Sequence, residues 1–73
     1  MNNTRLLLSA MLKQNRNSLG LTQEQVAQIL NIDRSTYAYY ELGRSEPSLE
    51  NLIRLANLYG VTIDSLLCHN SEL

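Results

Sequence analysis

Three of the chain's four tyrosines fall within four residues, in the segment RSTYAYYELGR that runs from Arg34 to Arg44. Aromatic rings with hydroxyl tips can form a stacking surface, fill part of a core, or bond a ligand. If the segment is helical, successive residues turn by about 100°, so Tyr37, Tyr40 and Glu41 share one face. The remaining side chains point the other way: Ser35, Ala38, Tyr39 and Leu42. We therefore expect the tyrosines to divide between two roles.

Other reactive side chains in the sequence form no catalytic or metal-binding set. Cys68 and His69 are adjacent, but no third group or further ligand accompanies them. With one cysteine and one histidine in the chain, a structural zinc site is not expected and an internal disulfide cannot form. Paired acids, a phosphate-binding loop and a nucleophile elbow are also missing from the sequence. We predict no enzyme activity, no metal and no cofactor.

Length and composition indicate one small globular domain over residues 1–73, with 44% hydrophobic and 18% charged residues. A single cysteine fits a reducing, cytoplasmic setting. The longest apolar run, Leu6 to Leu8, is far shorter than the ~20 residues of a membrane helix, and no signal peptide is apparent. Because the net charge is −1, any basic surface for nucleic acid must come from the arrangement of the side chains.

Helix start and stop signals recur at short intervals, and no alternating strand pattern appears. The first helix is predicted to begin near Asn3 or Thr4 and to end before Gly20. A second begins at Thr22, whose hydroxyl can form a capping box with Gln25. It stops at Asn31, because asparagine tolerates a left-handed backbone better than other non-glycine residues.

Three further helices complete an all-α, compact five-helix prediction. Asp33 is expected to cap the third, which runs to Gly43. Pro47-Ser48 opens the fourth, which ends at Gly60. Its apolar residues at helical spacing are Leu49, Leu52, Ile53 and Ala56. Thr62 caps a short fifth over residues 63–67, and a short polar tail occupies residues 69–73.

The second and third helices are separated by only about three residues, Asn31 to Asp33. Two short helices joined by so tight a turn form a helix-turn-helix, here at about residues 22–42. In such a pair the second helix can enter the major groove of DNA. Helical hairpins also occur in many proteins that never touch DNA, so this geometry alone leaves the function open.

Two segments of the chain resemble the Xre or Cro/lambda-repressor-like helix-turn-helix regulators. They are GLTQEQVAQIL, from Gly20 to Leu30, and STYAYYELGRSEPSLENLIRLANLYGVTIDSLL, from Ser35 to Leu67. The Thr-Gln start of the second helix, the Glu-x-Gly end of the third and the Gly-Val-Thr-x-Asp-x-Leu-Leu ending follow the family's order and spacing. The resemblance implies a lambda-repressor-like fold and sequence-specific binding of double-stranded DNA. Asn31 replaces a frequent glycine, and the few polar residues of the third helix leave the target sequence open.

Base contacts are expected from three residues of the third helix. Arg34 lies in its first turn and has two donors for O6 and N7 of guanine, with a phosphate contact or solvation as the alternative. Ser35 can bond a base or a phosphate. The resemblance places Tyr39 at a position that commonly reads bases; the alternative is an exposed tyrosine without a role.

Phosphate contacts are expected from four residues: Gln23, Thr36, Arg44 and Asn51. Gln23 begins the second helix, where backbone amides and the helix dipole favour an anion. The resemblance makes it a phosphate clamp that also braces the recognition helix, and the alternative is an exposed first-turn glutamine. Arg44 follows Gly43 in a loop that, in the family, presents amides and a basic side chain to the DNA backbone.

Structural roles are predicted for the inward-facing side chains of the third helix. Tyr37 and Tyr40 match core positions of the family, with direct DNA contact as the alternative. An unpaired Glu41 carboxylate on the same face would be costly. The resemblance implies that Arg16 forms a structural ion pair with it.

A module this small makes few DNA contacts, so we expect a homodimer on an inverted-repeat operator with half-sites about 34 Å apart. The C-terminal part carries a surplus of large apolar residues and is the expected dimer interface: Leu58, Ile63, Leu66 and Leu67. Such a dimer would act as a repressor or regulator by occupying the operator. A protein-binding module, such as an antitoxin or anti-repressor partner, remains the alternative because the chain is slightly acidic. Met1 and the polar end favour a whole small regulator over a piece of a longer one.

Overall fold

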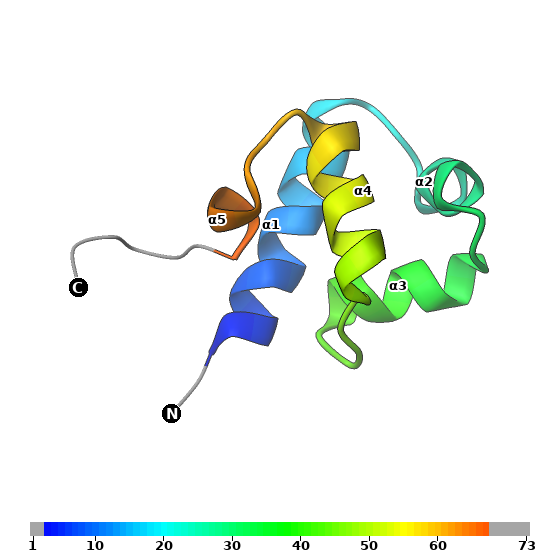
Figure 1. Ribbon diagram of the computed structural model, residues 1–73. Helices are drawn as coiled ribbons and strands as arrows, with labels where there is room; N and C mark the ends of the chain where they lie inside the picture. The colour runs from blue at the N-terminus through cyan, green and yellow to red at the C-terminus, as the bar shows by residue number, and fades with distance from the viewer. Residues whose placement is uncertain (1–2, 68–73) are drawn as a thin grey trace.

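The computed structural model describes residues 3–67, and they form five helices without a strand (Figure 1). The bounds are α1 Thr4–Ser18, α2 Gln23–Leu30, α3 Arg34–Leu42, α4 Leu49–Tyr59 and α5 Ile63–Leu66. The predicted all-α, five-helix class is confirmed. The predicted polar tail 69–73 and the Cys68-His69 pair lie outside the described residues.

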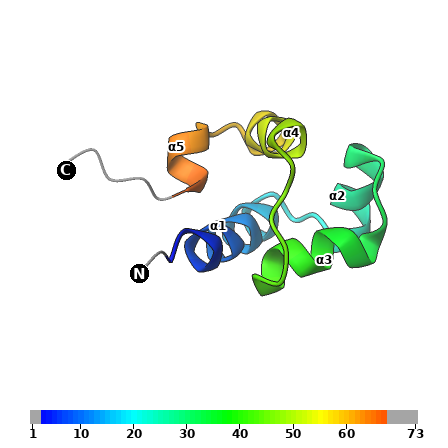
Figure 2. The ribbon, with the colours of Figure 1, turned by 60° about the horizontal axis from the view of Figure 1, so that its bottom comes forward.

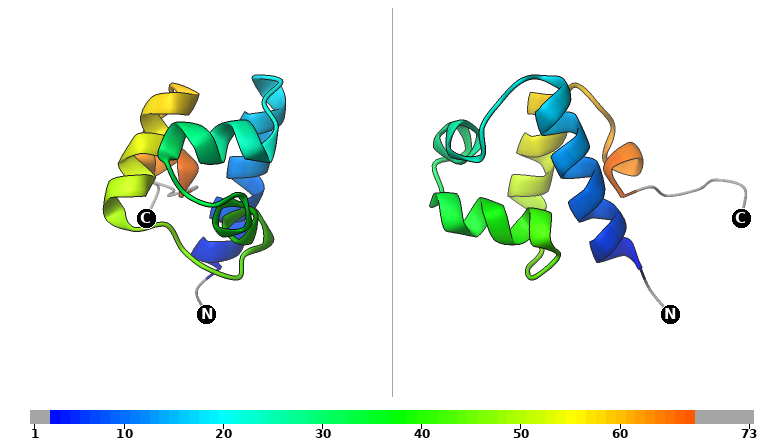
Figure 3. Two further views of the ribbon diagram at one scale, coloured as in Figure 1. Left: turned by 90° about the vertical axis from the view of Figure 1, so that its right-hand side faces the viewer. Right: turned by 180° about the vertical axis from the view of Figure 1, so that it is seen from behind.

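The helices are arranged with α1 and α4 between the α2–α3 pair on one side and α5 on the other (Figures 1 and 3). Helix α3 packs against α1 and α2, while α5 packs against α1 and α4. In Figure 2, α3 lies along one margin of the molecule, with α1 and α2 behind it. One long side of α3 is therefore anchored, and the other is free to meet a partner.

The N-terminal caps predicted at Thr22 and Thr62 are confirmed. The Thr22 hydroxyl accepts from the Gln25 backbone N–H at 3.1 Å, and the Gln25 side chain accepts from the Thr22 N–H at 2.8 Å, which is the predicted capping box. Ser48 and Thr62 accept in the same way at the starts of α4 and α5. Asp33 precedes α3 as predicted, but the expected side-chain cap is wrong, because its carboxylate makes no such hydrogen bond. Asp33 is exposed, so water can satisfy both the carboxylate and the first-turn amides.

The first four helices all end in the same hydrogen-bonding motif. A residue with positive φ follows each helix: Gly20, Asn31, Gly43 and Gly60. The N–H of the next residue then bonds back to a carbonyl five positions earlier, as in a Schellman motif. These next residues are Leu21, Ile32, Arg44 and Val61. Asn31 thus supplies the left-handed turn of the helix-turn-helix, with φ 58°. An added Cβ at Gly43 would also lie 3.1 Å from Leu6 Cδ2, so the exposed Leu6 side chain would have to shift.

Side chains from all five helices form one core: Leu8, Leu12, Val26, Ala27, Leu30, Tyr37, Tyr40, Leu55, Ala56, Tyr59 and Leu66. The predicted burial of Tyr37 and Tyr40 is confirmed, and their rings meet edge to face with centroids 6.1 Å apart. Their packing fixes α3 against the rest of the domain.

The buried face of α4 agrees only in part with the one that its apolar spacing suggested: Ala56 is buried and Leu52 packs against the core. Leu49 and Ile53 are 71% and 44% exposed, while Leu55 and Tyr59 are buried. Seven of the eleven residues of α4 are apolar, so more than one face has the 3.6-residue spacing. The contacts of α4 with α2 and α5 decide between those faces.

The prediction that Leu66 belongs to a dimer interface is wrong, because its side chain is fully buried in the core of one chain. Three other members of the predicted interface, Leu58, Ile63 and Leu67, are partly buried and pack against the same core. The C-terminal leucines are therefore used largely within the domain.

Candidate nucleic-acid interface

The outer face of α3 presents three of the predicted contact residues together. Arg34, Ser35 and Tyr39 are exposed, and Tyr39 keeps 45% of its accessible surface. Glu41 is the only acidic residue within α3, and its side chain is only 3% exposed. No carboxylate of α3 therefore faces outward beside the arginine, the hydroxyl and the aromatic ring, despite the net charge of −1.

Gln23, at the start of α2, connects this outer face to the interior. Its side-chain amide donates to Glu41 Oε1 at 3.0 Å, and its carbonyl accepts from Arg34 Nη1 at 3.3 Å. Gln23 is thus bonded to both ends of α3, as a residue that braces the recognition helix would be. The hydrogen bond also tethers the Arg34 guanidinium beside the first turn of α3, where it can still reach outward.

The Arg16–Glu41 pair lies at the inner end of this chain of contacts. Arg16 Nε donates to Glu41 Oε2 at 2.7 Å and Nη2 donates to Oε1 at 3.0 Å, a two-pronged pairing of guanidinium and carboxylate. Arg16 Nη1 also donates to the Leu21 carbonyl at 3.0 Å. The pair joins α1 to α3 and to the loop that leads into α2, so it holds the helix-turn-helix on the domain.

The charges of this pair are stabilised by each other. Burial alone would raise the pKa of the Glu41 carboxyl, but hydrogen bonds from Arg16, Tyr37 and Gln23 outweigh it and lower that pKa. The hydrogen bond to Glu41 raises the pKa of the Arg16 guanidinium despite its partial burial. Both groups are therefore charged at neutral pH.

Tyr37 forms a second buried polar contact. Its hydroxyl lies 2.7 Å from the hydroxyl of Tyr59 on α4, and either oxygen can be the donor. Burial, together with the hydrogen bonds to Glu41 and Tyr59, raises the pKa of Tyr37 far above its ordinary 10.0. The ring and the hydroxyl of Tyr37 are therefore both used inside the domain, which argues against its alternative role in DNA contact.

The predicted phosphate ligands occupy different environments. Gln23 and Thr36 are half-buried, and Arg44 is exposed. Asn51, near the start of α4, donates its side-chain amide to the Tyr40 hydroxyl at 3.4 Å. Asn51 thus has an internal partner, whereas the cation of Arg44 faces solvent beside α3.

Arg44 makes a contact that our sequence reasoning missed. Its guanidinium carbon lies 5.9 Å from the centre of the Tyr39 ring, within the range of a cation–π contact. The left-handed cap predicted at Gly43 could have indicated this contact, because a Schellman motif brings residues that are five positions apart in the sequence close together. Two predicted DNA-contact residues therefore contact each other.

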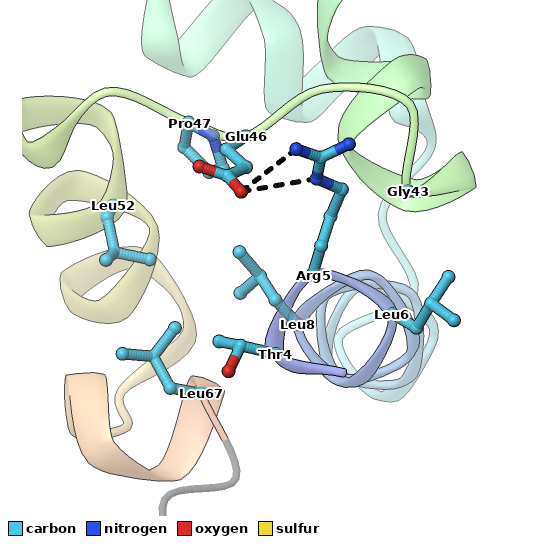
Figure 4. A pocket seen from close by; sticks show the side chains of 9 residues that line it. All are labelled: Thr4, Arg5, Leu6, Leu8, Gly43, Glu46, Pro47, Leu52 and Leu67. Atoms are coloured by element: carbon cyan, nitrogen blue, oxygen red, sulfur yellow. Dashed lines mark hydrogen bonds and ion pairs between the residues drawn. The ribbon is translucent and has the colours of Figure 1, made fainter. Parts of the chain in front are cut away.

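A cleft of about 640 Å³ lies away from this outer face, between the start of α1, the α3–α4 loop, α4 and the end of α5 (Figure 4). Aliphatic side chains, among them Leu8, Leu52 and Leu67, line it. Arg5 and Glu46 form an exposed ion pair of 3.2 Å at its edge. Among residues 3–67, no three His, Cys, Asp or Glu side chains could hold a metal ion. No helix in that range is long and apolar enough to cross a bilayer.

Comparison with known proteins decides the family. A family model described as helix-turn-helix matches residues 12–66. The chain belongs to this helix-turn-helix family. The Xre-like resemblance predicted from the motifs is thereby confirmed. The matched range contains both helices of the helix-turn-helix and most of the core that supports them.

Several named helix-turn-helix relatives are similar to this chain. The SPbeta prophage-derived uncharacterized HTH-type transcriptional regulator YonR of Bacillus subtilis is 45% identical over 56 residues, 77% of this chain and 52% of YonR. The cryptic phage CTXphi transcriptional repressor RstR of Vibrio cholerae is 36% identical over 61 residues, 84% of this chain and 55% of RstR. This chain therefore covers only about half of either relative.

Solved structures agree with the family. The crystal structure of a transcriptional regulator from Listeria innocua superimposes with a TM-score of 0.83 at 35% identity, covering 90% of this chain and 62% of that one. A hypothetical transcription factor from Neisseria gives a TM-score of 0.78 at 28% identity, covering 86% and 72%. The helical arrangement described above is thus that of solved transcription regulators.

Proposed function

We propose that this domain binds double-stranded DNA sequence-specifically by placing the outer face of α3 in the major groove. The observation that carries the proposal is the exposed set Arg34, Ser35 and Tyr39, on a helix whose only carboxylate is buried in an ion pair. Membership of the helix-turn-helix family and similarity to proteins named as transcriptional regulators and repressors support it. The domain then acts by binding rather than by catalysis.

Each contact residue has a role that follows from its chemistry and position. Arg34 offers two donors to a guanine, and its bond to Gln23 limits its motion before DNA arrives. Ser35 and Tyr39 contact base edges. Gln23, Thr36 and Arg44 contact phosphates, which position the helix without reading the sequence. Asn51 is the weakest phosphate candidate, because its amide must leave Tyr40 or share its donors.

The regulator is proposed to work as a homodimer on an inverted-repeat operator in the cytoplasm. A single module buries too little surface for the affinity of a specific regulator. The candidate dimer surface is now reduced to Leu58, Ile63 and Leu67, each of which keeps part of its side chain accessible. Buried Leu66 supports them from beneath. Repression would follow from occupancy of the operator.

Fluorescence anisotropy with a labelled random duplex tests the proposal first. Binding should weaken steeply as salt rises, because phosphate contacts release counterions. Gln23→Ala should weaken binding without lowering the salt dependence, because glutamine carries no charge. Arg44→Ala, which removes an exposed cation beside α3, should weaken binding and lower the salt dependence. Lys13→Ala, which removes an exposed cation from α1, serves as the matched control and should change affinity less. Absence of any salt-dependent binding by the natural chain would refute the proposal.

A protein-binding role is the second candidate, and the cleft of Figure 4 is the observation that favours it. Leu8, Leu52 and Leu67 could receive an apolar segment of an antitoxin- or anti-repressor-type partner. Because that cleft and the outer face of α3 use different residues, Leu52→Gln should leave DNA binding intact. If the folded protein binds no duplex at any salt concentration, the DNA-binding role is refuted and the protein-binding role is favoured.

A further inference from the structure

The ends of the first four helices provide an internal comparison. Each ends in a Schellman motif, and the residue after the left-handed position is Leu21, Ile32, Arg44 or Val61. In this motif that residue usually makes an apolar contact near the last turn of the helix. Leu21, Ile32 and Val61 are apolar and pack against the core. Arg44 alone among the four is charged and exposed.

At the end of α3 the same motif brings Arg44 to Tyr39 instead of to the core. The Arg44 N–H donates to the Tyr39 carbonyl at 3.0 Å, and the Gly43 N–H donates to the Tyr40 carbonyl at 3.3 Å. Gly43, at φ 74°, reverses the chain direction there. The backbone thereby carries the Arg44 guanidinium over the exposed Tyr39 ring, at 5.9 Å from its centre. The contact that elsewhere closes a helix against the core here lies on the outer face.

We propose that Arg44 is a positioning residue for Tyr39, and that the two side chains read DNA as one unit. An exposed tyrosine can choose among several rotamers, and choosing one on binding costs entropy. A guanidinium that covers one side of the ring narrows this choice before DNA arrives. The other side, the ring edge and the hydroxyl stay accessible for a base. The inference rests on the proposed function, and it gives Arg44 a part in sequence preference beyond a phosphate contact.

Two roles of Arg44 can be separated by their dependence on sequence. A phosphate contact contributes alike to all duplexes. A positioning contact contributes only where Tyr39 meets a base, and only while the Tyr39 ring is present. Lysine keeps the charge of Arg44 but lacks the planar group that stacks on an aromatic ring. Arg44→Lys should therefore preserve much of the general affinity and still alter sequence preference.

Selection of bound sequences from random duplexes, followed by affinity measurements, tests the proposal. The natural chain, Tyr39→Ala, Arg44→Lys, Arg44→Ala and the double alanine variant are compared. Preference at the base pairs affected by Tyr39→Ala should fall by about 2- to 5-fold in Arg44→Ala, the size expected of an exposed cation–π contact. It should fall by less in Arg44→Lys, because an ammonium can also lie over the ring. In the Tyr39→Ala background, Arg44→Ala should lower affinity for all duplexes equally and leave preference unchanged. If Arg44→Ala acts uniformly whether or not Tyr39 is present, Arg44 is an independent phosphate ligand and the proposal is overturned.

Proton NMR of the free protein gives a second readout that does not need DNA. The Arg44 side-chain protons should be shifted upfield by the Tyr39 ring current, and the shift should vanish in Tyr39→Ala. Unshifted Arg44 protons in the natural chain would overturn the proposal even if DNA binds. Shifted protons without any duplex binding would show the contact but refute the function on which the inference rests.

Discussion

The two faces of α3 differ in where their side chains find partners. On the inner face, Tyr37 and Glu41 are bonded to residues of α4, α1 and α2. On the outer face, Arg34 contacts Gln23 and Tyr39 contacts Arg44, and Arg34 and Tyr39 both stay exposed. The nine residues of α3 thus form two faces with different roles. One face fixes the orientation of the helix on the domain, and the other is accessible to DNA. Changes on the two faces should therefore separate stability from recognition.

The largest effect is expected from Tyr37→Ala. The Tyr37 ring is fully buried against Tyr40, and its hydroxyl pairs with Tyr59. Removing a large buried aromatic side chain costs roughly 3–5 kcal/mol, out of the 5–15 kcal/mol that such a domain usually has. Thermal unfolding followed by circular dichroism should show a loss of the cooperative transition or a steep fall in its midpoint. A transition close to that of the natural chain would mean that the inner face does not anchor α3.

The next largest effect is expected from Glu41→Gln, which leaves the half-buried Arg16 charge without its carboxylate. Breaking a buried pair in this way costs roughly 3–5 kcal/mol, and the lower end is expected because the Arg16 side chain keeps 13% exposure. Urea unfolding at pH 7 should measure this loss. Glu50→Gln, which removes the carboxylate of the exposed Arg54–Glu50 pair, is the matched control and should cost less than about 1 kcal/mol.

Acid should reduce the difference between the natural chain and Glu41→Gln. The pKa of Glu41 is lower in the folded state than its ordinary 4.5. The ionised carboxylate therefore makes its full contribution to the free energy of unfolding above pH 4.5. The contribution is lost as the pH falls through the folded pKa. The amide of the variant has no such contribution to lose. Urea unfolding at a series of pH values below 4.5 decides this; a constant gap throughout would contradict it.

Removing a tyrosine hydroxyl should reduce stability by a smaller amount, and the amount should differ between the two buried tyrosines of the inner face. Tyr37→Phe leaves the Tyr59 hydroxyl buried without its 2.7 Å partner, which costs about 1–3 kcal/mol. Tyr40→Phe loses only a 3.4 Å contact with Asn51 and should cost less than Tyr37→Phe. Removing the Tyr59 hydroxyl as well, in Tyr37→Phe/Tyr59→Phe, should restore part of the loss, because no orphaned hydroxyl remains. Thermal midpoints of the four proteins are the measurement, and a larger effect in Tyr40→Phe would reverse the assignment.

The 100° turn per residue predicted which side chains of α3 share a face, and the family resemblance indicated which of the two faces is buried. The same reasoning was less successful in α4, where seven apolar residues fit more than one face and the packing of α2 and α5 decides which is buried. The prediction that Leu66 lies in a dimer interface was wrong for a related reason. A surplus of large apolar residues does not show which of them are buried within the domain and which remain on its surface.

Contacts between distant residues were harder to predict than helix ends. Helix ends depend on a few neighbouring residues, so Thr22, Asn31 and Gly43 could be placed from the sequence. The Arg16–Glu41 pair was expected from the family resemblance, since their spacing of 25 residues carries no local signal. The resemblance implied that Gln23 braces the recognition helix. Its two partners, Arg34 and Glu41, depend on how α2 crosses α3, which the structure supplies.

The smallest effect on stability is expected from Tyr39→Ala, at the centre of the outer face. The ring is 45% exposed and lies against exposed Arg44, so its removal should cost about 0.5 kcal/mol. A loss of about 1 kcal/mol lowers the Tm of a domain this size by about 4–8 °C, so this smaller loss should lower the Tm by less than about 4 °C. Tyr40→Ala, one residue further along α3, is the matched control, since its ring is 6% exposed and its loss should lower the midpoint steeply. DNA affinity of the still-folded Tyr39→Ala variant should nevertheless fall, most for the preferred duplex. A destabilised Tyr39→Ala beside a stable Tyr40→Ala would mean that α3 is rotated, and its reading face would then lie elsewhere.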